Sequence, residues 1–299
     1  MAHNIRLVDQ CPGCGGEHFK RQVAIGDDNR ERFHRFSKIK YGGLLDSWVD
    51  VLKPEIVACT DCGHHWYLRQ PSTEQLSEMY ANGRRLLVNE ISREPGYEMI
   101  AEMRRLVRLV GKRSPRLLDF GSGFGRWARA AARAGFQVHA YEPSTARGAE
   151  SVDEFTLVHD LAEIDGMKFD AINLEQVLEH VPAPLDTLHQ IRAYMEPNSI
   201  LRIRVPNITR SLEGPEIWRV WPYDGTHVHV MAPFEHLHGF TPESFIALSR
   251  RADLRVISGL RFAFTHPKAW FREVVRPISQ KWASTSALLV DAQRRTLER

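Results

Sequence analysis

The glycines and acids of residues 117–142 are spaced for binding a nucleotide. The apolar run 116–120 predicts a buried strand, and the glycines after it allow a sharp turn beside a ligand. Residues 126–134 favour a helix, whose amino end would present free N–H groups to the turn. After a second predicted strand, 136–141, Glu142 can accept hydrogen bonds from both hydroxyls of an adenosine ribose. The residues of the turn are Gly121, Ser122, Gly123 and Gly125.

The order of these residues decides between two kinds of nucleotide site. Residues 123–128 match the loose G-x-G-x-x-G/A pattern of dinucleotide sites, but there the first glycine directly ends the strand. Here Asp119 and Phe120 precede Gly121, which gives D-x-G-x-G-x-G. The chain thus resembles the class I S-adenosylmethionine-dependent methyltransferases. The resemblance implies that S-adenosylmethionine is the cofactor, that Asp119 orders the turn and the methionine end, and that Glu142 binds the ribose. A glycine turn without a ligand is the alternative.

The resemblance continues along the next strands. A third strand is predicted at 155–158, and Asp160 and Leu161 follow it where the family has a carboxylate near the adenine amino group. A fourth strand is predicted at 168–174. Glu175 begins a segment similar to the one that follows this strand in small-molecule methyltransferases. The resemblance therefore adds Asp160, Leu161 and Glu175 to the predicted cofactor site.

The four cysteines form two C-x-x-C pairs: Cys11 with Cys14, and Cys59 with Cys62. Each pair can direct two thiolates at one ion, and the glycine that follows permits the tight turn beneath the sulfurs. Four thiolates leave no position open for water, so a structural zinc ion is predicted. Two disulfides are the alternative, which an intracellular setting disfavours. Residues 36–53, between the pairs, are expected to supply strands of the zinc ribbon.

A four-cysteine ribbon ahead of such a core resembles the zinc-containing subgroup of class I methyltransferases, which includes C-methyltransferases of nucleotide-linked deoxysugars. The resemblance covers about residues 8–262 and implies a small, sugar-containing acceptor. Two features depart from the sugar C-methyltransferases. Little sequence follows the core, and their tyrosine-rich segment is reduced to residues 80–83.

Aromatic residues and histidines gather in residues 218–240, where such enzymes shape the acceptor pocket. Glu235 and His236 match a Glu–His pair implicated as the base in sugar C-methyltransferases. Methyl transfer is an in-line displacement, so a base is needed only for weak acceptors such as a hydroxyl or an activated carbon. We therefore predict His236 as the base with Glu235 beside it, and His180 as a further catalytic candidate. The alternative is that His236 only docks the helix beginning near Thr241.

The composition narrows the classes of partner. The net charge of +3 is mildly basic, short of that of a dedicated nucleic-acid binder. No apolar run approaches the roughly 18 residues of a membrane span, and the first residues lack a signal-peptide core. We expect a cytoplasmic protein without a transmembrane segment. Two alternatives stay open: an RNA methyltransferase that grips phosphates with the ribbon and the arginines of 104–116, and a non-catalytic cofactor-binding interaction protein.

The predicted fold is α/β, a doubly wound Rossmann-like methyltransferase sheet with a small amino-terminal zinc ribbon. The predicted parts are a zinc ribbon at 1–70, a helical connector at 71–112, an S-adenosylmethionine-dependent methyltransferase core at 113–265 and a C-terminal helical extension at 266–299. Apolar residues of the extension are expected to pack on the core or on the second subunit of a homodimer. The predicted function is methyl transfer to an oxygen or carbon of a small acceptor that contains a sugar, such as a nucleotide-sugar or a glycan.

Overall fold

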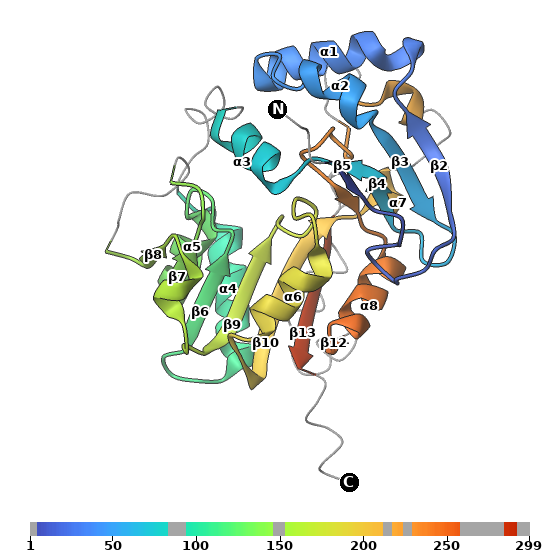
Figure 1. Cartoon of the computed structure of the whole chain (residues 1–299). Helices are drawn as coiled ribbons and strands as arrows, with labels where there is room; N and C mark the ends of the chain where they lie inside the picture. The colour runs from blue at the N-terminus through green and yellow to red at the C-terminus, as the bar shows by residue number, and fades with distance from the viewer. Residues whose placement is uncertain are drawn as a thin grey trace.

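The computed structural model of the chain describes residues 5–82, 94–145, 153–211, 217–223, 229–257 and 284–291. Within them lie a seven-stranded sheet, a four-stranded sheet and a two-stranded sheet. In Figure 1 the seven-stranded sheet forms one half of the molecule, and the amino-terminal elements with the smaller sheets form the other. No helix in this described part is both long enough and apolar enough to cross a membrane.

Five parallel strands form the centre of the large sheet. They are β6 (Arg116–Phe120), β7 (Gln137–Tyr141), β8 (Thr156–Val158), β9 (Phe169–Glu175) and β10 (Met195–Pro206). Their spatial order is β8-β7-β6-β9-β10, so the chain runs outward from β6 to β8 and then resumes on the other side of β6. The prediction of a doubly wound, Rossmann-like sheet is confirmed. In such a sheet, ligands bind at the carboxyl ends of the strands, near the point where the order reverses.

The sheet is completed by a strand from the end of the chain. Strand β13 (Ser284–Asp291) lies between β10 and β12 (Leu254–Ile257) and is antiparallel to both, as Figure 1 shows. The predicted helical extension, 266–299, is therefore wrong for these eight residues. A short apolar run fits a strand as well as a helix, and here β10 offers it an edge to pair with. The other residues of the predicted extension lie outside the described part of the chain.

Helices cover both faces of the large sheet. They are α4 (Tyr97–Val110), α5 (Arg126–Ala134), α6 (Pro184–Arg192), α8 (Pro242–Arg251) and the short 3-10 helix η3 (Leu161–Ile164). Alternate residues of a strand point to opposite faces. Leu118, Ile172 and Leu201 therefore share a core with α6 and α8, whereas Leu117 and Ala171 pack toward α4 and α5.

The smaller sheets begin in the amino-terminal part. The four-stranded sheet contains β2 (Phe19–Ala24), β3 (Glu55–Cys59), β4 (His65–Tyr67) and β11 (His238–Gly239), and β1 (Arg6–Leu7) pairs with β5 (Arg69–Gln70). The helices of this half are α1 (Asp27–Tyr41), α2 (Asp46–Leu52), α3 (Thr73–Asn82), α7 (Ile208–Ser211) and the 3-10 helix η4 (Ile217–Val220). All strand pairs in these two sheets are antiparallel.

Residues 36–53 contain the end of α1, a turn and α2 rather than ribbon strands, so that prediction is wrong. The physical reason is visible on α1, where the buried residues Asn29, Phe33 and Phe36 recur at helical spacing. Gly42 then ends the helix with a φ of 61°, the left-handed conformation of a common helix terminus.

The amino-terminal half shares its hydrophobic core with a segment far along the chain. Phe33, Trp48 and Tyr67 pack in one cluster with Trp221 and Phe234. The predicted division at residue 70 therefore separates residues that are buried together. Because this later segment also leads from β10 to α8, the shared core fixes the amino-terminal half over the carboxyl ends of the parallel strands.

Candidate active site

The turn after β6 is built from glycines in the left-handed region. The φ angles of Gly121, Gly123 and Gly125 are 75°, 55° and 75°. A Cβ on Gly121 would lie 2.8 Å from Cγ2 of Val177, and one on Gly125 would lie 2.8 Å from Cζ of Phe155. A Cβ on Gly123 would instead meet none of the described atoms within 4 Å. The backbone at Gly123 is thus open to close approach by a ligand.

Glu142 is held against this turn. It follows β7, is 6% exposed, and its Oε2 accepts a hydrogen bond from the Gly123 N–H at 2.9 Å. Its Oε1 accepts one from the Ser144 N–H at 3.0 Å. The Gly121 N–H donates to the Tyr141 carbonyl at 2.8 Å, which joins the turn to the end of β7. Each carboxylate oxygen keeps a further lone pair, so Glu142 can still accept from ribose hydroxyls.

Asp160 and Leu161 lie at the next strand end. Asp160 caps η3, since its Oδ1 accepts from the Ala162 N–H at 2.9 Å. His159 Nδ1 hydrogen-bonds the Glu142 carbonyl oxygen at 2.7 Å, which ties this segment to the neighbouring strand end. Asp160 is exposed and Leu161 is half-buried. The structure therefore brings the predicted adenine and ribose residues to one edge of the sheet.

Asp119 lies beneath the turn and is almost fully buried. Its Oδ1 accepts a hydrogen bond from Asn173 Nδ2 at 2.7 Å, and burial raises the pKa of the carboxyl to about 7. Its Oδ2 has no hydrogen-bond partner among the described residues, and the same holds for the buried Oγ of Ser122. Two unsatisfied polar atoms, one in the glycine turn and one in the strand that leads into it, suit a ligand that carries hydrogen-bond donors. The ammonium and hydroxyl groups of S-adenosylmethionine are such donors, so the residues present fit this cofactor.

Glu175 ends β9, but its carboxylate is engaged by arginines. Oε2 accepts from Arg202 Nη1 at 2.8 Å, and Oε1 accepts from Arg204 Nη1 at 3.4 Å. Both arginines also bond Glu102 of α4, and the guanidinium of Arg202 lies 4.3 Å from the ring centroid of Trp127. Glu175, predicted to contact the cofactor, therefore belongs to a buried ion-pair network. The sequence signal for this network was the alternation Arg202-Ile203-Arg204, which puts two arginines on one face of a buried strand.

A second group of polar side chains lies beyond the turn. His180 Nδ1 lies 2.6 Å from the Glu235 carbonyl oxygen and 3.1 Å from the Tyr80 hydroxyl. His236 Nδ1 lies 2.6 Å from the Val230 carbonyl oxygen. The two imidazole rings meet edge to face, with centroids 4.7 Å apart. All three predicted catalytic residues are thus brought together. We call His180, Glu235, His236, Tyr41, Tyr80 and Glu179 the histidine cluster.

Three members of this cluster were not predicted from the sequence. Tyr41 of α1 donates its hydroxyl hydrogen to Glu235 Oε2 at 2.9 Å, and Tyr80 comes from α3. Glu179 is fully buried next to His180, and burial raises the pKa of its carboxyl well above the usual range. The adjacent Glu179 and His180 were the available sequence signal. The tyrosines reach the cluster only through the shared core.

A family model described as a methyltransferase domain matches residues 93–259, which include the glycine turn, Glu142 and strands β6 to β10. The chain belongs to this family of methyltransferase domains. The predicted resemblance to the class I enzymes is thereby confirmed, and the protein is an S-adenosylmethionine-dependent methyltransferase. No curated protein sequence matches the chain.

Solved structures of other methyltransferases resemble this one. The plantazolicin methyltransferase BpumL, in complex with a monoazolic desmethylPZN analog and SAH, is 12% identical with a TM-score of 0.48, over 88% of this chain and 98% of that chain. The 1,6-didemethyltoxoflavin-N1-methyltransferase of Burkholderia thailandensis is 16% identical with a TM-score of 0.46, over 78% and 97%. A protein from an antibiotic biosynthesis pathway of Anabaena variabilis is 17% identical with a TM-score of 0.39, over 53% of this chain and only 64% of that one.

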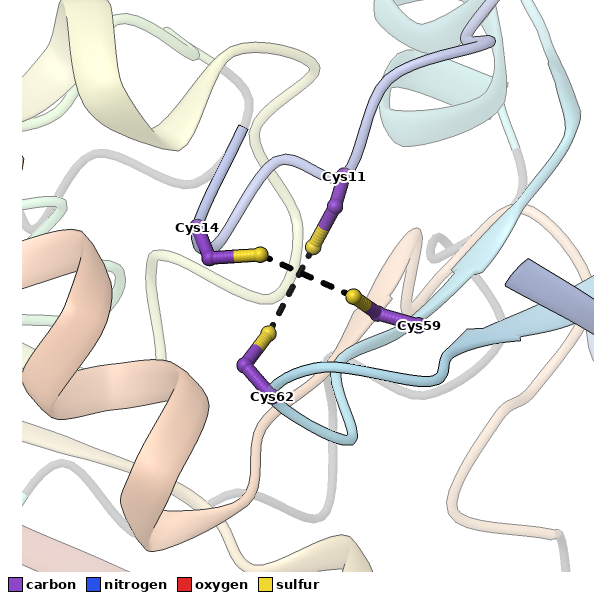
Figure 2. Close-up of side chains that lie close together, drawn as sticks. All are labelled: Cys11, Cys14, Cys59 and Cys62. Carbon is purple, nitrogen blue, oxygen red and sulfur yellow. Dashed lines mark hydrogen bonds between the residues drawn. The ribbon is translucent and has the colours of Figure 1, made fainter. Parts of the chain in front are cut away.

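The cysteines of the methyltransferase converge on one point (Figure 2). The Sγ atoms of Cys11 and Cys62 lie 3.5 Å apart, and those of Cys14 and Cys59 lie 3.6 Å apart. Disulfide sulfurs would be separated by about 2.05 Å. Sulfurs bound tetrahedrally to one zinc at about 2.3 Å lie about 3.8 Å apart, close to the observed spacing. The four residues therefore fit a zinc ion and not two disulfides.

Proposed function

We propose that this methyltransferase transfers a methyl group from S-adenosylmethionine to an oxygen or carbon of a small, sugar-containing acceptor. The observation that carries the proposal is the position of the histidine cluster. Val177 packs on Gly121 of the glycine turn, and the backbone of the same short segment continues to Glu179 and His180. Methyl transfer requires the acceptor atom in line with the departing sulfur, so an acceptor held by the cluster lies next to the cofactor.

The composition of the cluster supports a polyhydroxyl acceptor. Two imidazoles, two phenols and two carboxyl groups converge from four separate segments, and each can donate or accept a hydrogen bond. A hydroxyl or an activated carbon must lose a proton during transfer. We assign that task to the cluster and take His236 as the residue on which turnover depends, with His180 and Glu235 beside it.

For the cofactor, we propose that the turn residues Gly121, Ser122, Gly123 and Gly125 hold the methionine end together with Asp119. Glu142 binds the ribose hydroxyls, and Asp160 with Leu161 lies at the adenine. Glu175 acts indirectly, because its carboxylate anchors Arg202, which donates to Asn173, the partner of Asp119.

We also propose that Cys11, Cys14, Cys59 and Cys62 hold a structural zinc ion. The spacing of the sulfurs supports this assignment. With four protein ligands, no coordination position is open to a substrate. The ion stabilises the connection between β3 and the amino-terminal loop.

The acceptor can be identified with methyl-labelled S-adenosylmethionine and a fractionated extract of a strain that lacks the gene. Label in small anionic metabolites or in glycan is the expected result. Label in RNA would overturn the sugar-containing acceptor, and purified protein that binds the cofactor without labelling any fraction would favour a non-catalytic role.

Turnover should fall about 10²- to 10⁴-fold in His236→Ala, the range for loss of a group that handles a proton, while the affinity for S-adenosylmethionine stays unchanged. His189→Ala is the matched control, because His189 is exposed on α6. Turnover near the wild-type value in His236→Ala would show that this histidine only docks the segment before α8.

A further inference from the structure

The histidine cluster contains a buried carboxylate whose charge is not compensated by a hydrogen bond. Glu179 has no exposed surface, and neither Oε1 nor Oε2 has a hydrogen-bond partner within the described residues. Its backbone is fixed, since its carbonyl oxygen accepts from the Leu237 N–H at 2.7 Å. A buried ionised carboxylate without a partner costs several kcal/mol, so a carboxylate in this position calls for a proton or a cation.

Two histidines lie within reach of that carboxylate. His180 Nε2 is 3.9 Å from Glu179 Oε1. One ligand atom from each of Glu179, His180 and His236 lies within 4.8 Å of the other two. Two donors on one ion, each at about 2.1 Å, are at most about 4.2 Å apart. Small side-chain movements would therefore bring all three onto a single ion.

The backbone around the histidines selects the form that binds a metal. A carbonyl oxygen can only accept, so the 2.6 Å contacts of His180 Nδ1 with Glu235 and of His236 Nδ1 with Val230 require a hydrogen on each Nδ1. The neutral ring then carries its lone pair on Nε2. Metal-binding histidines are commonly oriented in this way, with the second ring nitrogen donating to a backbone carbonyl.

We propose that Glu179, His180 and His236 form a second metal site, which binds a divalent transition-metal ion and through it an oxygen of the acceptor. Two imidazoles and one carboxylate suit Zn²⁺, Mn²⁺ or Fe²⁺ and leave coordination positions open, unlike the four-cysteine site. The part concerning the acceptor rests on the proposed function. A bound cation makes a coordinated hydroxyl more acidic, so this site would prepare a weak acceptor for methylation.

The free ring nitrogen of His236 can bind either the metal ion or a proton, but not both. A ring nitrogen bound to a metal cannot take up a proton, so a metal site replaces His236 as a free base. Metal dependence of turnover separates these two roles. Binding of the ion itself can be measured without any acceptor.

The test uses full-length protein that retains its cysteine-bound zinc. Mn²⁺ is titrated and followed by electron paramagnetic resonance, because four thiolates disfavour Mn²⁺ and a nitrogen–oxygen site accepts it. We expect one bound Mn²⁺ per chain. Loss of one ligand should weaken binding at least about tenfold, since loss of a residue that merely orients a ligand already costs that much. Glu179→Gln and His236→Asn are the test variants, and His189→Ala is the control.

Unchanged S-adenosylhomocysteine affinity shows that each variant is folded. The second metal site would be overturned if the wild-type protein bound no Mn²⁺ and contained no more than one zinc ion per chain. Mn²⁺ affinity that is the same in wild type and both variants would also overturn it. Turnover that persists after chelation of the second ion would overturn its link to the acceptor while the proposed methyl transfer stands. Bound Mn²⁺ without methyl transfer to any sugar-containing fraction would instead remove the proposed function and leave the metal site.

Discussion

Replacement of Gly123 by alanine separates backbone strain from a steric clash, two effects that usually occur together at a glycine turn. Gly123 has a φ of 55°, and a Cβ there would meet none of the described atoms within 4 Å. The substitution therefore adds backbone strain without a clash in the protein itself. If the open space belongs to S-adenosylmethionine, the added methyl group collides only with the cofactor.

The expected losses of stability and of cofactor affinity follow from these two observations. An L-residue in the left-handed region costs about 1–2 kcal/mol of stability. An extra methyl group in a close-packed contact costs about 1–3 kcal/mol, which corresponds to a roughly 5- to 150-fold loss of cofactor affinity. Gly111 is the matched control, because it has a φ of 69°, no described atom within 4 Å of its Cβ position, and a place at the end of α4.

The assay combines chemical unfolding with calorimetric titration of S-adenosylhomocysteine. Gly111→Ala and Gly123→Ala should lose similar stability, whereas only Gly123→Ala should lose affinity. Equal affinity in the two variants would refute the placement of the cofactor at this turn, even if both proteins were destabilised as expected.

Three further outcomes are expected. The pKa of Asp119, about 7 against 3.8 for an exposed aspartate, means that the folded state binds more protons, so stability should fall as pH rises from about 4 to about 7. Asp119→Asn should flatten that part of a stability–pH curve from chemical unfolding, and an unaltered slope would contradict the burial argument. Cys59→Ser should lose cysteine-bound zinc in a metal-content measurement and lower the thermal midpoint. An unchanged zinc content would contradict the assignment of the ion to these cysteines. The Thr241 hydroxyl accepts from the Ser244 N–H at 3.0 Å and donates to the Cys62 carbonyl at 2.9 Å. Thr241→Ala should therefore lower the free energy of unfolding by about 1–2 kcal/mol. An unchanged free energy of unfolding would show that this cap does not stabilise the protein.

The parallel strands and the cofactor turn were predictable because their signals are local. A buried parallel strand is a short apolar run, and the distance from the turn to Glu142 is set by one helix and one strand. The helical residues 36–53 were not recognised, because the cysteine pairs on either side suggested a ribbon. Asn29, Phe33 and Phe36 already carried the helical spacing.

The acceptor side depends on contacts that span the chain, which a local pattern cannot show. Tyr41 meets Glu235 only because α1 and the later segment share a core. Glu179 becomes distinctive only when the fold removes it from solvent. Among the residues that we propose to hold the acceptor, a family motif therefore marked His236, whereas Tyr41 and Glu179 were missed.

The late position of β13 and β11 has a consequence for the order of events during synthesis. The amino-terminal half needs β11 and the 208–237 part of its core, and β10 needs β13, which ends at Asp291. A growing chain therefore carries apolar surface such as Phe33 and Trp48 without its cover until about residue 237 has been made, which favours chaperone binding. The sulfurs of all four cysteines are available once residue 62 has been made. An ion held there would be the first long-range link in the nascent protein, in place before either sheet can be completed.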